Sequence, residues 1–394
     1  MRLNNLLRYA VRILNDYSGE IPLAGFLKNY FRQNPQMGSK DRKQVSEMIY
    51  CFYRLGHTLK NISPEERILT GLFLCNHKKE QILESLYPEW HQQVENSTGK
   101  KVEMVRRKYS DFNELEIFPW KDQLSTGIDH RQYCLSFLEK PRLFIRIRPG
   151  YEISLTAKLQ QHKLDAVDPD PDKALPFKSF SFDAGTRLED VIILNREAVI
   201  QDLGSQRTAL FLKQDNRKEF EAWDCCTGSG GKSILMSDLY PGLKLTVSDI
   251  RESILKNCTQ RLKEAGIEPV RMFKTDLTDP NDIPRQPFNF IIADLPCTGS
   301  GTWSRTPEAL YYFNPDAIRD FRLRQEKILA NISSRLKPGG ILVYMTCSVF
   351  AEENERLASE RAGTGLMKIE REELIAGYLE TADSMYAARF TKLR

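Results

Sequence analysis

The stretch DCCTGSGGKS, residues 224–233, decides how the C-terminal half of this 394-residue chain is expected to fold. It places glycines and a Lys-Ser pair directly after an apolar segment, as phosphate-binding loops do. A triphosphate loop would need a glycine at position 226, where Cys226 stands, and a dinucleotide loop would need one at Ser233. The glycines therefore predict a close approach of the backbone to some other ligand.

Apolar strands alternate with helices around this loop. We expect strands to end at the glycine loop and then at Asp249, Asp276, Asp294 and Cys347. Helices are expected over 232–239, 251–265 and 316–336, the last followed by a KPGG stop signal at 337–340. Near-continuous apolar strands that alternate with helices predict a parallel α/β sheet covered on both faces.

Two other regions precede this one, so we expect three parts. Residues 1–128 are typical of a helical domain, with helices over 3–16, 40–53 and 65–76. Residues 129–205 are expected to form a linker and a small α/β subdomain, with strands at 143–149, 191–195 and 198–203 and a helix at 156–164. Residues 206–394 would then form the larger α/β domain.

Composition narrows the class of protein. Apolar residues make up 41% and charged residues 28%, as in soluble globular proteins, and no apolar run reaches the roughly 20 residues of a membrane span. The eight cysteines lack C-x-x-C pairs, which favours reduced thiols in a cytoplasmic protein. The Arg-bearing N-terminus fits a first helix better than a targeting peptide.

Charge is unevenly distributed. The chain has a net charge of +4, yet residues 1–60 hold ten Lys/Arg against four Asp/Glu, which is 10 − 4 = +6. A polyanionic partner and an ordinary solvated helical face explain this excess equally well.

Acidic side chains fall at the carboxyl ends of the expected strands, where open α/β sheets bind ligands. Asp249, 21 residues after Gly228, stands where a carboxylate accepts hydrogen bonds from ribose hydroxyls. With Asp276 and Asp294 it would repel a triphosphate but suit S-adenosylmethionine, which has a ribose, an adenine amine and positive charge. The alternative for each Asp is a solvated strand end or a helix cap.

Cys297 and Cys347 follow two different strands at the same expected edge. Carbon 5 of a pyrimidine is a poor nucleophile, but a thiolate that adds to carbon 6 makes carbon 5 reactive toward a methyl donor. A second thiol could act as a base or assist the release of the first. The spacing does not say which cysteine has which role.

At these residues the chain resembles the RsmB/Sun/Nop family of RNA cytosine-5 methyltransferases. The resemblance rests on DCCTGSGGKS, on DLPCTGSGTWSRTPE (294–308) and on TCSVFAEENE (346–355), with LFIRIRP (143–149) similar to the family's RNA-side subdomain. The stretch GSKDRKQVSEMIYCFYRLGH (38–57) resembles the NusB-type helical domain of the RsmB branch. The resemblance implies a Rossmann-like methyltransferase domain with a ferredoxin-like or RRM-like subdomain and a NusB-like N-terminal domain.

The resemblance also implies roles for individual residues. Cys347 would be the nucleophile and Cys297 would help to release the product. Asp249 would bind the ribose, Asp276 would lie near the adenine, and Asp294 would lie in the active pocket. The loop that binds S-adenosylmethionine would be Cys226, Thr227, Gly228, Ser229, Gly230, Gly231 and Lys232, and the RNA contacts would include Arg146, Pro296 and Arg305.

Three positions depart from the family pattern. Thr227-Gly228-Ser229 stands in place of Ala-Ala-Pro, Trp303-Ser304-Arg305-Thr306 replaces a more basic stretch, and Arg148 replaces an Asn. None of these changes removes a reacting group.

We therefore expect a cytoplasmic, monomeric RNA cytosine-5 methyltransferase that needs neither metal nor membrane. Small-subunit (16S) ribosomal RNA is the favoured substrate and transfer RNA the alternative. An unstacked base and salt-sensitive binding through Lys and Arg would follow. The rival hypotheses are an NTPase and a catalytically weak RNA-binding assembly factor.

Overall fold

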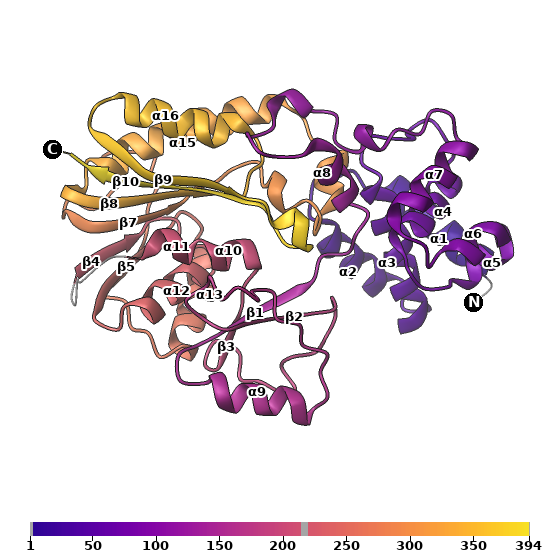
Figure 1. Cartoon of the computed structure of the whole chain (residues 1–394), viewed down its shortest axis with the longest axis horizontal. Helices are drawn as coiled ribbons and strands as arrows, with labels where there is room; N and C mark the ends of the chain where they lie inside the picture. The colour runs from indigo at the N-terminus through magenta and orange to yellow at the C-terminus, as the bar shows by residue number, and fades with distance from the viewer. Residues whose placement is uncertain (1–2, 214–219, 394) are drawn as a thin grey trace. The chain divides into compact units, whose positions relative to one another are not determined.

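The computed structural model describes residues 3–213 and 220–393 (Figure 1). The chain forms two compact units, and neither is a single continuous segment. The helical unit comprises Met1–Asp122, Ile128–Lys140 and Thr302–Asn314, and the α/β unit comprises Gln123–Gly127, Pro141–Gly301 and Pro315–Arg394. The expected boundary at 205 is not a division between units, because the small sheet belongs to the same unit as the large one.

The helical unit contains helices and no strand among its described residues. The helices expected at 3–16, 40–53 and 65–76 are present with small shifts at their ends. No helix in the described part of the chain is long and apolar enough to span a membrane. The helices of this unit are α1 (Leu3–Asp16), α2 (Leu23–Gln33), α3 (Ser39–Arg54), α4 (Pro64–Cys75), α5 (Gln81–Leu86), α6 (Pro88–Gln93), α7 (Thr98–Lys108), η1 (Glu114–Ile117), η2 (Lys121–Gln123, which runs to the boundary), α8 (His130–Ser136) and α14 (Pro307–Tyr311).

Segment Thr302–Asn314 completes the aromatic core of the helical unit. Tyr53 of α3 lies 5.3 Å from the ring of Tyr311 and 5.9 Å from that of Tyr312, measured between centroids. Its hydroxyl is 3.3 Å from the hydroxyl of Tyr312. Glu308 accepts a hydrogen bond from the backbone N of Leu23 at the start of α2. A segment that is far away in the sequence thus fills space between the N-terminal helices.

The α/β unit contains a small antiparallel sheet of three strands in the order β2-β1-β3. Ile145, Ile147 and Phe182 form its apolar face against Leu155 and Leu159 of the adjoining helix. The expected strand at 191–195 is wrong: these residues form turns, and β2 takes the place beside β1 instead. The elements are β1 (Leu143–Ile147), α9 (Glu152–Gln161), β2 (Ser179–Phe182) and β3 (Ala198–Ile200).

The large sheet has seven strands in the order β6-β5-β4-β7-β8-β10-β9. The strands from β6 to β8 are parallel, and β10 pairs antiparallel with both β8 and β9. All five expected strands are present, so the predicted Rossmann-like fold is confirmed. The sequence pattern did not predict the two antiparallel strands β9 and β10. The strands are β4 (Phe220–Asp224), β5 (Leu243–Asp249), β6 (Arg271–Lys274), β7 (Phe288–Asp294), β8 (Leu336–Thr346), β9 (Met367–Ile375) and β10 (Met385–Lys392).

Helices cover both faces of this sheet (Figure 1). Alternate residues of each strand point to opposite faces, so Trp223 packs with one layer and Ala222 with the other. One layer is formed by α15 (Asp316–Ser333) and α16 (Glu355–Gly363). The other is formed by α10 (Leu203–Arg207), α11 (Ala209–Leu212), α12 (Gly231–Leu239) and α13 (Glu252–Glu264), and the short helices η3 (Ser300–Thr302), η4 (Ala351–Glu353) and η5 (Gly377–Glu380) lie in loops.

The KPGG segment at 337–340 is part of a strand rather than a stop signal after a helix. Helix α15 ends at Ser333 and β8 begins at Leu336, so KPGG lies within the first residues of β8. The pairing of β7 with β8 shifts register there, between Phe288 and Phe290. Gly339 has a φ of +69°, a backbone conformation that glycine adopts without a Cβ penalty.

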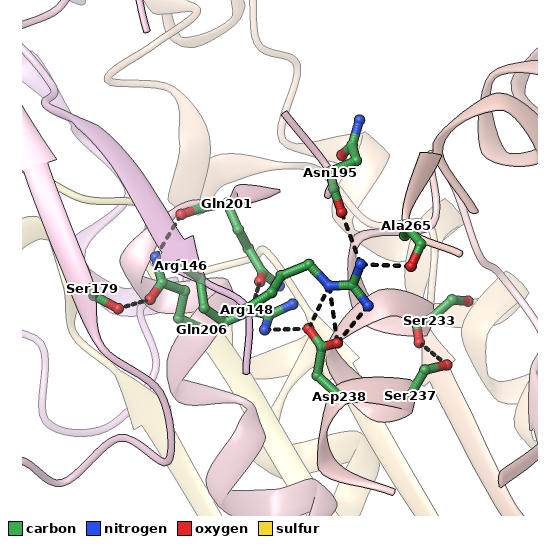
Figure 2. Close-up of polar contacts among 10 residues, drawn as sticks. All are labelled: Arg146, Arg148, Ser179, Asn195, Gln201, Gln206, Ser233, Ser237, Asp238 and Ala265. Carbon is green, nitrogen blue, oxygen red and sulfur yellow. Dashed lines mark hydrogen bonds and ion pairs between the residues drawn. The ribbon is translucent and has the colours of Figure 1, made fainter. Parts of the chain in front are cut away.

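Arg146 of β1 and Arg148, which directly follows β1, fasten the small sheet to α12, as Figure 2 shows. Arg146 Nη1 lies 2.6 Å and Arg148 Nη2 2.8 Å from the carboxylate of Asp238. Arg148 also donates to the backbone O of Asn195 and of Ala265 at the end of α13. The side chains of Arg146 and Asp238 are only 1% and 3% exposed, so this carboxylate balances charge in a buried interface.

Asp238→Ala should destabilise the α/β unit strongly. Two buried guanidinium groups would lose their counter-charge, and breaking a buried ion pair from one side costs about 3–5 kcal/mol. Urea unfolding monitored by hydrogen exchange of the β1 peptide measures this loss in the free energy of unfolding.

Glu221→Ala is the matched control, because its partner Lys337 and Glu221 itself are 36% and 49% exposed. An exposed pair contributes about 1 kcal/mol or less. Equal losses in the two variants would contradict the structural role of Asp238.

Candidate active site

The strand order of the large sheet reverses between β4 and β7. From β4 the chain moves outward through β5 and β6, and from β7 it moves the opposite way through β8. The loops that follow β4 and β7 therefore diverge and leave a crevice at the carboxyl edge, where such sheets bind ligands. The glycine loop and the Asp294–Cys297 segment both lie at this point.

A cavity of about 600 Å³ opens at this edge within the α/β unit. It brings together groups from the ends of five strands, as the sequence predicted for the sheet. Sixteen residues line it, and the predicted site residues among them are Cys226, Gly228, Asp249, Asp276, Asp294, Pro296, Cys297 and Cys347. Five predicted loop residues do not line the cavity: Thr227, Ser229, Gly230, Gly231 and Lys232.

Hydrogen bonds hold the glycine loop in place. Thr227 donates its backbone N to the O of Ser248, and its Oγ1 lies 2.9 Å from the Oγ of Ser233. Gly230 has a φ of +86°, and a Cβ there would lie 3.0 Å from the Sγ of Cys258. The departure from the family pattern at Thr227 thus adds a polar anchor to the loop.

Lys232 links the glycine loop to the end of β7. Its Nζ lies 2.7 Å from Oδ2 of Asp294. Burial acts to lower the pKa of Lys232, but the Asp294 carboxylate and the nearby Cys347 outweigh this and raise it. The side chain is therefore a buried ammonium group beside Cys347 and is already paired with a carboxylate.

The two predicted thiols are in contact. The Sγ atoms of Cys297 and Cys347 lie 3.3 Å apart, at the ends of the neighbouring parallel strands β7 and β8. The hydrogen bond with Cys347, together with burial, raises the pKa of Cys297 well above its ordinary value. Cys297 therefore keeps its proton at neutral pH, whereas Cys347 has the Lys232 ammonium nearby.

Comparison with known proteins agrees with this geometry. Residues 209–374 match the family described as 16S rRNA methyltransferase RsmB/F. The match covers 166 of the 394 residues, less than half of the chain. The match includes the glycine loop, both thiols and the strands that position them.

Related sequences match part of the chain. Ribosomal RNA small subunit methyltransferase B of Salmonella paratyphi A is 32% identical over 155 residues, which are 39% of this chain and 36% of that protein. The protein of the same name from Salmonella newport is 33% identical over 156 residues, with the same shares. The similarity thus spans about a third of the length of these relatives.

Solved structures extend the likeness of fold. PH0851 has a TM-score of 0.70 at 17% identity and covers 97% of both chains. NSun6 from Pyrococcus horikoshii with SFG has a TM-score of 0.57 at 14% identity, over 68% of this chain and 94% of that one. At such identities the likeness concerns the fold alone.

A buried carboxylate that the sequence analysis missed joins the two loops that carry the thiols. Glu353 is fully buried and accepts hydrogen bonds from the backbone N and Oγ1 of Thr298 and from the Oγ of Ser348. Gln325 of α15 donates to Glu353 and to the backbone O of Pro296. Each thiol is therefore followed by a residue that Glu353 holds.

Gln325 gave a signal in the sequence. It interrupts the apolar stripe of the helix at 316–336, and the structure buries it completely. A polar residue on a buried helical face needs partners for its amide, so its position indicated a polar network.

The carboxylate of Asp249 already accepts hydrogen bonds from groups of the protein. Oδ2 of Asp249 accepts the backbone N of Gly228 at 3.0 Å, and both carboxylate oxygens accept hydrogen bonds from Arg251. Burial acts to raise the pKa of Asp249, but these donors hold it below its ordinary value. The Arg251 side chain is 60% exposed, so it can move away from the carboxylate when a ligand enters.

Two of the three residues predicted to contact RNA are not among the residues that line the cavity. Arg146 is 1% exposed and its guanidinium is paired with Asp238, so the structure places it inside the protein rather than on an RNA-facing surface. Arg305 lies in Thr302–Asn314, which belongs to the helical unit. Pro296 lines the cavity next to Cys297.

Asp224 is a second carboxylate that the sequence analysis missed. It is 1% exposed, and its Oδ2 accepts a hydrogen bond from the Oγ of Ser233 while Oδ1 has no partner among the described residues. Burial raises the pKa of Asp224 to about 7, against the hydrogen bond from Ser233 and with a contribution from the Asp294 charge.

This shift predicts a pH dependence of stability. Between the ordinary pKa of 3.8 and the raised value of about 7, the folded state binds more protons than the unfolded state. The free energy of unfolding should therefore fall as pH rises through this interval, by an amount on the order of 4 kcal/mol. Asp224→Asn should lose this fall, as urea unfolding at about pH 5 and pH 8 would show.

Asp320→Asn is the control, because Asp320 is exposed on α15. It should keep the pH dependence of the wild type. A wild type and an Asp224→Asn variant with parallel pH profiles would contradict the prediction.

Proposed function

We propose that this protein transfers a methyl group from S-adenosylmethionine to carbon 5 of a cytosine in RNA. The contact between the Cys297 and Cys347 thiols at the edge of the cavity supports the proposal most directly. Methyl transfer to carbon 5 needs a nucleophile for carbon 6 and a second group for its release. The RsmB/F family match of residues 209–374 supports the same reaction.

The cavity fits S-adenosylmethionine. Gly228 brings backbone to its wall, and Asp249 follows β5 where a carboxylate accepts hydrogen bonds from a ribose. Asp276 and Asp294 add negative charge toward a cationic ligand. When bound, S-adenosylmethionine supplies an electrophilic methyl group.

We assign the nucleophile to Cys347. Its thiolate would form a bond to carbon 6, and the electron pair of the carbon 5–carbon 6 double bond would then attack the methyl carbon, whose bond to the sulfonium sulfur would break to leave S-adenosylhomocysteine. Loss of the carbon 5 proton and cleavage of the sulfur–carbon 6 bond would restore the double bond. Lys232 lies beside Cys347, and Cys297, which keeps its proton, is assigned to the release step.

Small-subunit ribosomal RNA is the substrate that we propose, because the relatives that match the catalytic domain are named for it. Transfer RNA is the alternative. The target base must leave its stack to reach a thiol at the end of β8. The helical unit, which we propose to be NusB-like, would bind the RNA backbone.

The structure weighs against an NTPase. The lysine of a triphosphate loop contacts phosphates, whereas Lys232 is buried and paired with Asp294. The three carboxylates of the cavity would also repel a triphosphate. An RNA-binding assembly factor is disfavoured because both thiols and the anchored loop are retained.

Covalent trapping tests the assignment of the two cysteines. With S-adenosylmethionine and RNA from cells that lack this gene, Cys297→Ala should accumulate a protein–RNA adduct that survives a denaturing gel. Cys347→Ala should form none, and both variants should lose methyl transfer by at least about a hundredfold.

Cys134→Ala is the control thiol, because Cys134 is buried in the helical unit. It should behave as the wild type does. An adduct with Cys347→Ala but not with Cys297→Ala would exchange the two roles, and no adduct with either variant despite methyl transfer by the wild type would refute the covalent mechanism.

Calorimetry tests the binding of the methyl donor. Asp249→Ala should weaken S-adenosylhomocysteine binding by about tenfold or more, because the ribose hydroxyls lose a charged acceptor. Glu252→Ala is the control, since Glu252 is 70% exposed in the next helix. Stabilisation of the wild type by ATP-magnesium but not by S-adenosylhomocysteine would favour the NTPase.

A further inference from the structure

The helical unit has a concave site of its own, lined by residues of the segment 86–108. A cavity of about 650 Å³ lies between α5–α6 and α7, all labelled in Figure 1. Its apolar lining is Leu86, Tyr87, Pro88, Trp90 and Met104, and its charged lining is Glu89, Arg107 and Lys108. We call this site the α6–α7 groove.

Three rings form a stack that runs from the core of the helical unit to the α6–α7 groove. Phe73 and Trp90 are buried, and their ring centroids lie 4.7 Å apart at an interplanar angle of 14°. Trp90 and Tyr87 follow at 4.8 Å and 20°. Tyr87 is partly exposed, so the stack ends at the surface with an aromatic ring.

Positive charge lies beside this stack rather than over its end. The Lys108 Nζ is 3.7 Å from the ring centroid of Tyr87 and 5.1 Å from that of Trp90. The ammonium group lies over the ring of Tyr87 and, with the two rings 4.8 Å apart, these distances place it on the side of Tyr87 that faces Trp90, so it does not cap the outer face.

Two cations of the groove have no carboxylate partner within the described part of the chain. Arg106 of the last turn of α7 is paired with Glu114, but neither Arg107 nor Lys108 makes an ion pair. Against them the groove has one carboxylate, that of Glu89. An apolar slot that ends in a ring and has cations beside it complements a stacked base with adjacent phosphates.

We propose that the α6–α7 groove binds single-stranded RNA, with one unstacked base on the outer face of Tyr87 and the neighbouring phosphates on Arg107 and Lys108. This inference rests on the proposed function for the choice of RNA as the polyanion. Base stacking on an aromatic ring tolerates any base, so the groove adds affinity without selecting a sequence. An acidic peptide is the competing occupant.

Fluorescence anisotropy with the full chain and an unstructured RNA of about 12 nucleotides tests the groove. Tyr87→Leu should weaken binding five- to a hundredfold, whereas Tyr87→Phe, which keeps the ring, should bind as the wild type does. Arg107→Gln with Lys108→Gln should lower the slope of log affinity against log salt by about 1.4, because two phosphate contacts are lost.

Lys78→Gln with Lys79→Gln is the matched control, because it removes the same charge from exposed positions outside the groove. It should change affinity by less than about twofold. Crosslinking of 4-thiouridine RNA to the wild-type protein should label the peptide that contains Tyr87, and this test needs no variant to fold. RNA affinity unchanged in Tyr87→Leu and in the double glutamine variant would overturn the proposal. So would an acidic peptide bound through Arg107 and Lys108 when RNA is not.

Methyl-transfer kinetics separate this inference from the proposed function. Tyr87→Leu should raise KM for RNA and leave kcat within about twofold, since the groove contacts no reacting atom. If the wild type binds RNA through Tyr87 but methylates none, the proposed function fails and the groove proposal stands. If the wild type methylates RNA and Tyr87→Leu has an unchanged KM, the groove proposal fails alone.

Discussion

The ion pair between Lys232 and Asp294 spans the point where the strand order of the large sheet reverses. It links the helix that follows β4 to the last residue of β7. The loops that leave these two strands run in opposite directions along the sheet. The farther end of the same helix α12 is fixed by Asp238, which meets Arg146 and Arg148 of the small sheet. Helix α12 is thus fixed near both ends by ion pairs, and the glycine loop at its start takes its position from these contacts.

The thiols depend on a second buried acid. Glu353 accepts hydrogen bonds from Thr298 and Ser348, the residues that directly follow Cys297 and Cys347. Burial raises the pKa of Glu353, while donors from both loops favour its charged form. The 3.3 Å contact of the two sulfur atoms is therefore set by a network that touches neither of them. A low-dielectric network of this kind is costly to leave half satisfied, so the two loops are constrained together.

The sequence predicted the parallel half of the large sheet because its strands are short apolar runs with polar groups at their ends. It did not predict β9 and β10, since an antiparallel edge has no such regular alternation with helices. The run at 191–195 has the composition of a strand, but tertiary pairing places β2 beside β1. KPGG resembles a helix stop, yet the chain enters β8 through it because the pairing with β7 tolerates a shift of register. Arg146 was read as an RNA contact because sequence does not reveal that Asp238, 92 residues away, pairs with it.

Segment Thr302–Asn314 has a consequence for modularity. It lies within the sequence that matches the RsmB/F family, yet Tyr311 and Tyr312 complete the aromatic core around Tyr53 of the helical unit. The chain passes between the units near residues 122, 127, 140, 301 and 314. The boundary drawn by sequence similarity and the boundary drawn by packing therefore do not coincide. The two units cannot be exchanged separately, because a foreign helical unit would have to pack its own aromatic core around segment Thr302–Asn314.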